Sequence, residues 1–466
     1  MNAKTTAMRL HPVMEGSILL ESTGGCALFG CPSEVLKEIL EKKLPIPHTV
    51  VLPEMLHKGQ SSQAAIEFLF FYYLFFYNGI EKHGKFRIFA THSQCRNLKE
   101  AMRIAILGPS EKEMRKGGMT KRLAEQLSRE LYYLAPPNPQ TNLPYDMEEM
   151  FEWNILSKNS KGILFPGKDR SSEFQIQQKG KTTFEVNGAG KSALVDISIR
   201  KIQSPPYEIN HKPVTVSPDQ LTVTVLGASD GFDPKAPANG YLFNFNGRLG
   251  IWDCPSYLHQ HLQKMKIDFD QIEALFLSHV HEDHIDPVES IRKNNPVELY
   301  CTPEVYYSLL LKIMTVMDCS MDDAKTFHHW HPIGVDKVHD IIGAKFDFFY
   351  SIHALPTVGC RISVGPENSE KSILISSDHA AFWMMRDMKR DGVLTEKRFN
   401  ASTQLIKGHE DLILIDVGGG TIHGNYEDYV DIESTIHFMH IGELPKLPEN
   451  KFLVKHADII DLNLSS

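Results

Sequence analysis

The sequence predicts an α/β fold with a metal site, and three patterns support this prediction. In both halves of the chain, short apolar segments typical of buried strands are followed by amphipathic segments typical of helices. One apolar strand in the second half runs directly into three histidines and an aspartate. A strand–helix–strand unit near the N-terminus matches the unit around that strand. We therefore expect two related modules, of which the second holds metal.

The metal-binding motif reads H-x-H-x-D-H and follows the apolar strand that ends at Ser278. His279 and His281 are two residues apart, so both can point the same way where the chain leaves the strand. Asp283 and His284 are expected in the turn that starts the next helix. Imidazole and carboxylate groups suit zinc, iron or manganese, and their crowding suits two ions. The alternative is a polar loop whose histidines only cap the following helix, which this dense pattern disfavours.

The motif resembles that of the metallo-β-lactamase fold, and its surroundings resemble the ribonuclease Z branch of that fold. The segment 251–255 (IWDCP), a helix predicted over 256–266 and the strand before His279 follow one another as in that branch. The resemblance implies an αββα sandwich for residues 217–466. It also implies that Asp253 supports the metal ligands without binding a metal itself.

The resemblance places further ligands at the ends of three strands. His353 resembles a family histidine, Asp378 stands where the family has a carboxylate shared by both metals, and His440 matches the last family histidine. His437 is the alternative to His440, but it lies inside its strand. The implied arrangement puts three histidines on one ion, two histidines and an aspartate on the other, and Asp378 on both. The expected ligands are His279, His281, Asp283, His284, His353, Asp378 and His440, around two divalent ions, zinc first and manganese or iron as alternatives.

One departure from the ribonuclease Z pattern bears on the reaction. The family carries a His-Glu-Ala-Thr segment where this chain has Asp416 and three glycines. His423 follows closely, and we expect it to donate a proton or to contact phosphate. We place it with Asp283 and Asp253 among the catalytic residues. A Gly-Pro-rich arm of the kind that holds tRNA is also not visible, which disfavours processing of tRNA 3′ ends.

The N-terminal region resembles a second copy of the strand–helix–strand unit that has lost its metal site. Gly30 stands where the second copy has Asp253, and residues 54–59 replace the metal motif. Two proline clusters then bound a stretch with alternating, strand-like segments. Within it, Gly188 to Ser192 resembles a phosphate loop, but lacks the first glycine and is expected to be a hairpin turn. The predicted domains are a degenerate metallo-β-lactamase-like half-domain at 1–135, a connecting β-rich segment at 136–216 and a catalytic domain at 217–466.

Charge and composition indicate which binding partners and which cellular compartment to expect. Residues 217–466 hold 21 Lys and Arg against 36 Asp and Glu, while residues 1–216 hold 28 against 22. The metal-binding half therefore lacks the basic excess of a nucleic-acid groove. Seven cysteines without paired spacing favour a reduced, cytoplasmic protein. The aromatic run at 68–77 is too short to span a bilayer, so we expect a buried helix or a contact between copies in a homo-oligomer.

These observations predict a dinuclear-metal-dependent hydrolase. Two metal ions can activate water, so no serine or cysteine nucleophile is needed. The acidic catalytic half favours a cyclic nucleotide or another small phosphodiester as substrate. A ribonuclease Z-like RNA endonuclease is the alternative within the same class. A di-iron protein that binds or activates oxygen is the alternative of another class, and a non-catalytic scaffold is a third.

Overall fold

The computed structural model describes residues 8–158, 160–167, 173–292 and 295–463. Contacts between residues divide the chain into two compact units, and each unit combines segments that are far apart in the sequence. The domain limits expected from the sequence, near residues 135 and 216, remain a proposal about the chain's modules. Unit 1 contains residues 1–102, 145–206 and 311–324, and unit 2 contains residues 103–144, 207–310 and 325–466.

Unit 2 contains two seven-stranded sheets. The first has the order β18-β17-β16-β15-β14-β13-β26. Its strands β13, β14 and β15 pair antiparallel, while β15 to β18 run parallel to one another. The strands are β13 (Leu221–Gly227), β14 (Gly240–Phe245), β15 (Arg248–Trp252), β16 (Ile272–Phe276), β17 (Val297–Cys301), β18 (His328–Pro332) and β26 (Ile459–Asp461).

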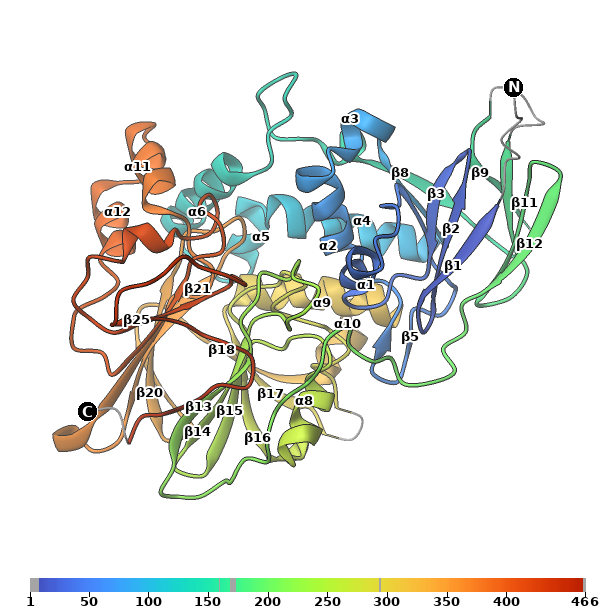
Figure 1. Ribbon diagram of the computed structural model, residues 1–466. Coiled ribbons are helices and arrows are strands. Elements are labelled where there is room, and N and C mark those ends of the chain that lie inside the picture. Colours follow the sequence, from blue (N-terminus) through green and yellow to red (C-terminus); the bar gives the residue numbers. More distant parts are fainter. Residues whose placement is uncertain (1–7, 159, 168–172, 293–294, 464–466) are drawn as a thin grey trace. The chain divides into compact units, whose positions relative to one another are not determined.

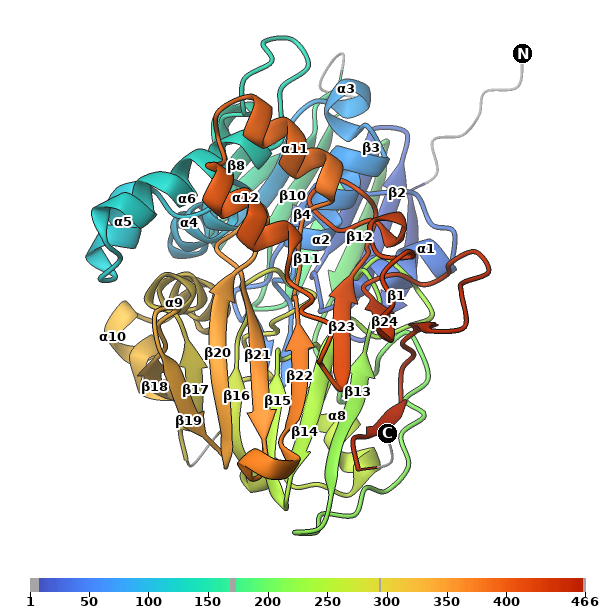
Figure 2. The same cartoon turned by 90° about the vertical axis from the view of Figure 1, so that its left-hand side faces the viewer.

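The second sheet of unit 2 has its strands in sequence order, from β19 to β25. Its first four strands form an antiparallel meander, and the last three add in parallel beside β22. Figure 2 shows β20, β21, β22 and β23 side by side. The strands are β19 (Val338–Ile341), β20 (Ala344–Tyr350), β21 (Val358–Val364), β22 (Lys371–Ile375), β23 (Leu412–Asp416), β24 (Ile436–Met439) and β25 (Lys451–Leu453).

The core of unit 2 lies between these two sheets (Figure 1). Alternation along the strands explains how each sheet buries two faces. Ile373 and Ile375 of β22 join the core between the sheets, while Leu374 points to the opposite face. That opposite face packs against Phe382, the first residue of α11. The helices of this unit include α5 (Glu111–Lys116), α6 (Lys121–Leu134), α8 (Leu258–Met265), α11 (Phe382–Arg390) and α12 (Glu396–Thr403), while α10 (Met321–Ala324) belongs to unit 1.

Unit 1 repeats the first half of this plan. Its six-stranded sheet has the order β1-β2-β3-β4-β7-β8, with two antiparallel pairings followed by three parallel ones. This order and these directions are the same as those from β13 to β18. A four-stranded antiparallel sheet packs on it through a shared apolar core. The first sheet comprises β1 (Arg9–Met14), β2 (Ser17–Ser22), β3 (Gly25–Phe29), β4 (Thr49–Val51), β7 (Phe86–Ala90) and β8 (Phe151–Ile155), and the second β9 (Lys161–Phe165), β10 (Phe174–Gln178), β11 (Thr183–Gly188) and β12 (Lys191–Asp196).

The remaining elements of the chain are short, except for two helices that begin in one unit and end in the other. Helix α4 (His92–Leu107) passes from unit 1 to unit 2, and α9 (Pro303–Met317) passes from unit 2 to unit 1. No helix among the residues that the structure describes is both long and apolar enough to cross a membrane. The others are α1 (Val35–Glu41), β5 (His57–Lys58), β6 (Ser61–Ser62), α2 (Glu67–Phe71), α3 (Gly79–His83) and α7 (Met147–Met150).

Of two local predictions, the hairpin turn is confirmed, and the buried helix expected for the aromatic run is confirmed as helical but only partly buried. The glycine-rich segment is the two-residue turn of the hairpin β11–β12, in which Gly188 pairs with Lys191. The aromatic run forms α2 and a following π-helix (Tyr72–Phe76) that buries Phe70 and Tyr73. Its far side remains open to solvent, since Phe76 is 64% exposed.

The prediction of a helix directly after the metal motif is wrong. Between β16 and β17, the residues that the structure describes form turns and no helix. The backbone explains the difference. The N–H of Cys254 donates to the carbonyl of His284 (2.7 Å), and the N–H of Asp286 donates to the carbonyl of Cys254 (2.8 Å). This bridge to the neighbouring segment holds the chain extended, and Pro287 follows immediately.

Candidate metal centre

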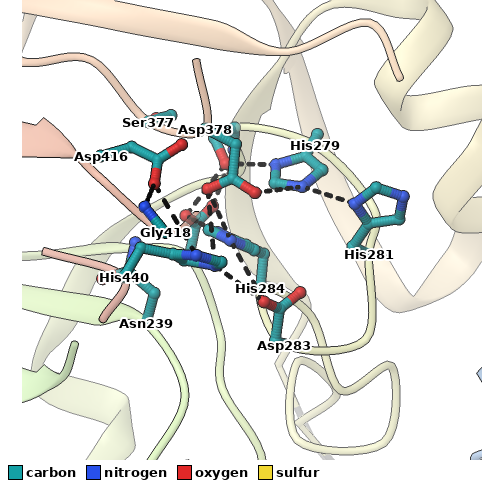
Figure 3. Close-up of polar contacts among 12 residues, drawn as sticks. Asn239, His279, His281, Asp283, His284, Ser377, Asp378, Asp416, Gly418 and His440 are labelled. Carbon is teal, nitrogen blue, oxygen red and sulfur yellow. Dashed lines mark hydrogen bonds and ion pairs between the residues drawn. The ribbon is translucent and has the colours of Figure 1, made fainter. Parts of the chain in front are cut away.

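The carboxyl ends of four strands in unit 2 supply a buried cluster of histidines and aspartates. The motif follows β16, His353 follows β20, Asp378 follows β22 and His440 follows β24. The seven ligands expected from the sequence therefore lie together in this unit, and each side chain is buried. Figure 3 shows His279 and His281 to the right of Asp378, His440 to its left, and His284 and Asp283 below it.

The first histidine set consists of His279, His281 and His353. Nδ1 of His281 lies 3.1 Å from Nε2 of His279 and 3.1 Å from Nε2 of His353. The opposite ring nitrogens point outward, where His281 donates to the carbonyl of Ala105 (3.2 Å) and His353 to that of Ile422 (2.9 Å). Because carbonyl oxygens only accept, these outer nitrogens carry the protons. The inner nitrogens then converge with their lone pairs, which is how metal-binding imidazoles are arranged.

The second set consists of Asp283, His284 and His440. Nε2 of His440 lies 2.9 Å from Oδ2 of Asp283, and Nε2 of His284 lies 3.8 Å from the same oxygen. The other nitrogen of His284, Nδ1, donates to Oδ2 of Asp253 (2.7 Å). This bond fixes the ring of His284 so that Nε2 faces the cluster.

Asp378 lies between the two sets and directs one oxygen to each. Oδ2 is 3.6 Å from Nε2 of His279 and 3.5 Å from Nε2 of His353. Oδ1 is 3.1 Å from Nε2 of His284 and 3.7 Å from Nε2 of His440. Within the described part of the chain, neither oxygen of Asp378 has a hydrogen-bond partner, although the residue is fully buried. A buried carboxylate without such partners is costly unless a cation neutralises it.

Burial and the local charges set the protonation of the cluster. Burial lowers the pKa of His353 to about 4 and that of His279 well below its ordinary value, so both imidazoles are neutral at neutral pH. Burial alone raises the pKa of Asp378, but the surrounding histidines, His284 first, outweigh it and hold that pKa well below its ordinary value. In the second set burial lowers the pKa values of His284 and His440, but the nearby carboxylates, Asp378 first, outweigh it. They raise the pKa of His440 to about 10 and that of His284 well above its ordinary value, so a bound divalent ion would take the place of these two protons. The donor set therefore fits two divalent ions.

Backbone strain occurs at three positions of the cluster. Asp253, Ser377 and His440 have φ values of 61°, 50° and 68°, in the left-handed region that non-glycine residues rarely occupy. Such outliers persist only where the surrounding structure fixes them, and they concentrate at functional sites. A side chain at the neighbouring Gly418 would also come within 2.5 Å of Nδ1 of His440, so only glycine fits there.

Asp253 does not face the cluster directly but orients two of its members. Its Oδ1 accepts the backbone N–H of Ser278 (2.8 Å), and its Oδ2 accepts the hydroxyl of Ser278 (2.9 Å) as well as Nδ1–H of His284. The oxygen of that hydroxyl lies 3.0 Å from Nδ1 of His279. Both oxygens of Asp253 are thus hydrogen-bonded within the protein, in contrast to those of Asp378.

Asp416, which was not among the site residues expected from the sequence, pairs with the expected His423 beside the cluster. Oδ2 of Asp416 accepts Nδ1–H of His423 (3.0 Å) and the backbone N–H of His379 (2.8 Å), while Oδ1 accepts the N–H of Gly418 (2.8 Å). The ring of His423 stacks on His440, with centroids 4.5 Å apart and planes at 19°. The available signal was that Asp416 ends an apolar strand, as Asp253 and Asp378 follow theirs. Potential ligand atoms of this pair also lie within 4.8 Å of those of Asp378 and His440.

His437, the alternative to His440, lies away from these contacts. It is a residue of β24, and its ring stacks on Phe452 with centroids 5.3 Å apart. Among the residues that the structure describes, it belongs to no group of three or more possible ligands.

Two facing sheets with ligands from their strand ends, and the H-x-H-x-D-H turn after β16, decide the fold of unit 2. It is the metallo-β-lactamase fold. Unit 1 is a smaller domain of similar type. A family model described as "Anti-Pycsar protein Apyc1" matches residues 221–393, which lie in unit 2 except for residues 311–324.

Comparison with known proteins finds relatives of this fold. The "cGMP-dependent 3′,5′-cGMP phosphodiesterase A" of Dictyostelium discoideum is 24% identical over 311 residues, covering 64% of this chain and 35% of the relative. The "cAMP/cGMP-dependent 3′,5′-cAMP/cGMP phosphodiesterase B" of the same organism is 28% identical over 222 residues, covering 46% of this chain and 20% of the relative. The chain thus spans about a third or less of these relatives. The metallo-β-lactamase fold protein YhfI from Bacillus subtilis is 16% identical with a TM-score of 0.39, covering 52% of this chain and 99% of that protein.

Proposed function

We propose that the protein is a dinuclear-metal-dependent phosphodiesterase that acts on a cyclic nucleotide or another small phosphodiester. The observation that carries this proposal is the position of Asp378, which sends one oxygen to each of two sets of buried ligand candidates. In this proposal the first histidine set holds one ion, the second set holds the other, and Asp378 serves both. Such a pair of ions supplies an activated water and neutralises the charge that grows on an attacked phosphoryl group.

The remaining residues of the site have distinct roles in the proposal. Asp253 positions His284 directly and His279 through Ser278, so that their inner nitrogens stay aimed at the ions. Asp416 accepts the Nδ1 proton of His423 and leaves Nε2 as the atom that can deliver a proton. Proton transfer from Nε2 to the leaving oxygen would complete the cleavage of an unactivated ester.

The substrate class is supported by charge and by the relatives. The metal-binding half carries 36 acidic against 21 basic residues, which disfavours a long polyanion more than a small diester. The two Dictyostelium relatives are named as cyclic-nucleotide phosphodiesterases. A ribonuclease Z-like activity on RNA remains the second candidate, supported by a ribonuclease Z of Alkaliphilus oremlandii that is 33% identical over 66 residues, 14% of this chain and 21% of that protein.

The proposal is tested with metal-loaded protein and three substrates. We expect cleavage of bis(p-nitrophenyl) phosphate and of a cyclic nucleotide, with much slower cleavage of a tRNA precursor. A chelator should abolish the activity and added metal should restore it. His440→Ala should lose metal and activity, while His437→Ala, three residues away in the same segment, should retain both.

The possible failures separate the alternatives. Preferred cleavage of the tRNA precursor would replace the small-diester substrate by RNA. Metal-loaded protein that cleaves no diester would contradict the hydrolase proposal. If that protein also showed iron absorption that changes with oxygen, the di-iron class would replace it.

A further inference from the structure

A second group of histidines lies in unit 2 outside the metal centre. His211 belongs to the segment before β13, His261 lies on α8, and His456 lies in the loop between β25 and β26. His211 and His261 are buried, and His456 is half-buried. One ligand atom from each lies within 4.8 Å of the others. We refer to these three residues as the peripheral histidine triad.

The first histidine set of the metal centre provides an internal standard for the peripheral triad. In that set, ring centroids are 4.9, 5.0 and 5.0 Å apart, with planes at 84°, 74° and 81°. In the peripheral triad the centroids are 5.2, 4.5 and 5.3 Å apart, with planes at 63°, 76° and 84°. The shortest distance between ring nitrogens is 3.1 Å in the first and 3.0 Å in the second, between Nε2 of His211 and Nδ1 of His261. In both groups the three imidazole rings are close together, and their planes are inclined to one another by 63–84°.

The proton positions also suit a ligand role. Nδ1–H of His456 donates to the carbonyl of Leu226 (2.7 Å), so Nε2 carries the lone pair of the neutral ring. This outward bond to a carbonyl repeats that of His353 in the metal centre. Nε2 accepts the backbone N–H of Asn210 (3.1 Å), the residue before His211, and a bound ion would take the place of that N–H.

The surroundings keep these imidazoles uncharged. Burial lowers the pKa of His211 to about 3, with a contribution from neighbouring His456, and burial also lowers the pKa of His456. In the described part of the chain the group contains no carboxylate. A set of neutral imidazoles alone selects zinc, copper or nickel over the hard cations magnesium, calcium and manganese.

We propose that the peripheral histidine triad binds one Zn²⁺ ion as a structural cross-link. The ion would join three segments that are distant in the sequence. The N–H of Val214 already donates to the carbonyl of Met265 at the end of α8 (3.0 Å), and the N–H of Ala457 donates to the carbonyl of Val225 in β13 (3.0 Å). Zinc would thus fasten two loops and a helix beside the first sheet, away from the reaction. The inference does not depend on the proposed function.

Metal analysis of full-length variants tests this inference. Protein is loaded with zinc by dialysis and passed over a chelating resin, and zinc per chain is then measured by mass spectrometry. His211→Ala and His456→Ala should each hold one zinc fewer than the wild-type protein. His437→Ala, a histidine outside both metal groups, is the matched control and should hold as much as wild type. Equal zinc in the triad variants and the control would overturn the inference.

A second measurement separates this site from the metal centre and does not rely on the triad variants alone. Asp378→Ala should lose zinc from the metal centre and still hold one ion in the triad. Added zinc should raise the Tm of Asp378→Ala by several degrees, because an ion that binds only the folded state stabilises it. A folded Asp378→Ala protein without zinc and without such a Tm shift would overturn the triad site. If Asp378→Ala kept its full zinc content, the ligand assignment of the proposed function would fail instead.

Discussion

The two similar sheets of the molecule share a backbone plan but differ in their chemistry. In unit 2, the N–H of Asp253 donates to the carbonyl of Phe276 (2.8 Å), and in unit 1 the N–H of Gly30 donates to that of Val51 (2.9 Å). Both positions have positive φ, 61° and 69°. The helices that follow begin after residues that are also left-handed, Tyr257 and Glu34. The two units therefore share their backbone hydrogen bonds and left-handed residues at these corresponding positions.

The two units differ in the segment that carries the metal motif in unit 2. The N–H of Cys31 donates to the carbonyl of Gln63 (3.1 Å), as that of Cys254 donates to the carbonyl of His284. Gln63 therefore occupies the backbone position of His284. The hairpin β5–β6 replaces the short turn that carries Asp283. The side chain of Gln63 donates to the carbonyls of Gly16 (3.1 Å) and Ile197 (2.8 Å), so it serves packing within unit 1.

The second sheets of the two units also share a common part and differ in the strands that carry site residues. Unit 1 has the antiparallel meander β9–β12, which corresponds to β19–β22. The described part of unit 1 adds no parallel strands to it, whereas unit 2 adds β23, β24 and β25. Asp416 is the last residue of β23, and His440 directly follows β24, so these added strands place both residues at the cluster. The comparison teaches that the apolar strands determine the frame, while the residues at strand ends determine the chemistry.

Exchanging the residue that distinguishes the copies should have the largest effect. His284→Gln places the unit 1 residue in the unit 2 frame, removes a candidate ligand and leaves the backbone position unchanged. We expect the loss of one metal per chain and a fall of diesterase activity to background, measured by metal analysis and bis(p-nitrophenyl) phosphate hydrolysis. The reciprocal Gln63→His should gain no metal, since the described residues of unit 1 include no group of three or more possible metal ligands. Full metal content in His284→Gln would remove this residue from the ligand set.

Removing His423 should have the next largest effect, since its strand connection has no counterpart among the described residues of unit 1. His423→Ala should slow esters with poor leaving groups by roughly 10²–10⁴-fold, the usual contribution of a general acid. Activated nitrophenyl esters should be affected far less, because their leaving groups need no proton. Equal slowing of both ester types, measured as kcat, would exclude the proton-donor role and favour a ligand role.

Asp253→Gly imports the unit 1 residue at the position that orients His284. Glycine accepts φ of 61° without strain, so the fold should be retained. Loss of the bonds to His284 and Ser278 should weaken metal binding by about 10–100-fold, as expected for a residue that orients a ligand. Competition with a chromophoric chelator measures this change. Unaltered affinity would show that Asp253 is not needed for ligand orientation.

The converse exchange, Gly30→Asp, should affect stability only. A Cβ at Gly30 would lie 2.2 Å from the carbonyl oxygen of Gly16, and φ of 69° adds strain. We expect a loss of about 1–3 kcal/mol in the free energy of unfolding, typical of overpacking, measured by denaturant unfolding. Gly59→Asp is the matched control, because Gly59 has φ of 61° with open space around it. Equal losses in both variants would mean that φ alone, and not the contact with Gly16, constrains this position.

Much of the site could be predicted from the sequence because its signals are local. The H-x-H-x-D-H motif, the apolar strands and the polar residue after each strand are visible as short patterns. Strands β20, β22 and β24 run in the same direction, so their carboxyl ends bring His353, Asp378 and His440 to one edge of the sheet. The repeated unit was visible for the same reason, since Gly30 to Ser33 and Asp253 to Ser256 lie in corresponding local contexts. These features depend on neighbours in the chain.

Other features depend on segments that meet only in the folded molecule. The helix expected after His284 is absent because Cys254 holds this segment extended through backbone bonds that no local pattern encodes. The pairing of Asp416 with His423, and the division of the two Asp378 oxygens between two sets, arise from side-chain directions. The peripheral triad joins residues that are 50 and 195 positions apart. Sequence spacing determines which face a residue takes on its own element, whereas the packing of distant elements decides which residues become neighbours.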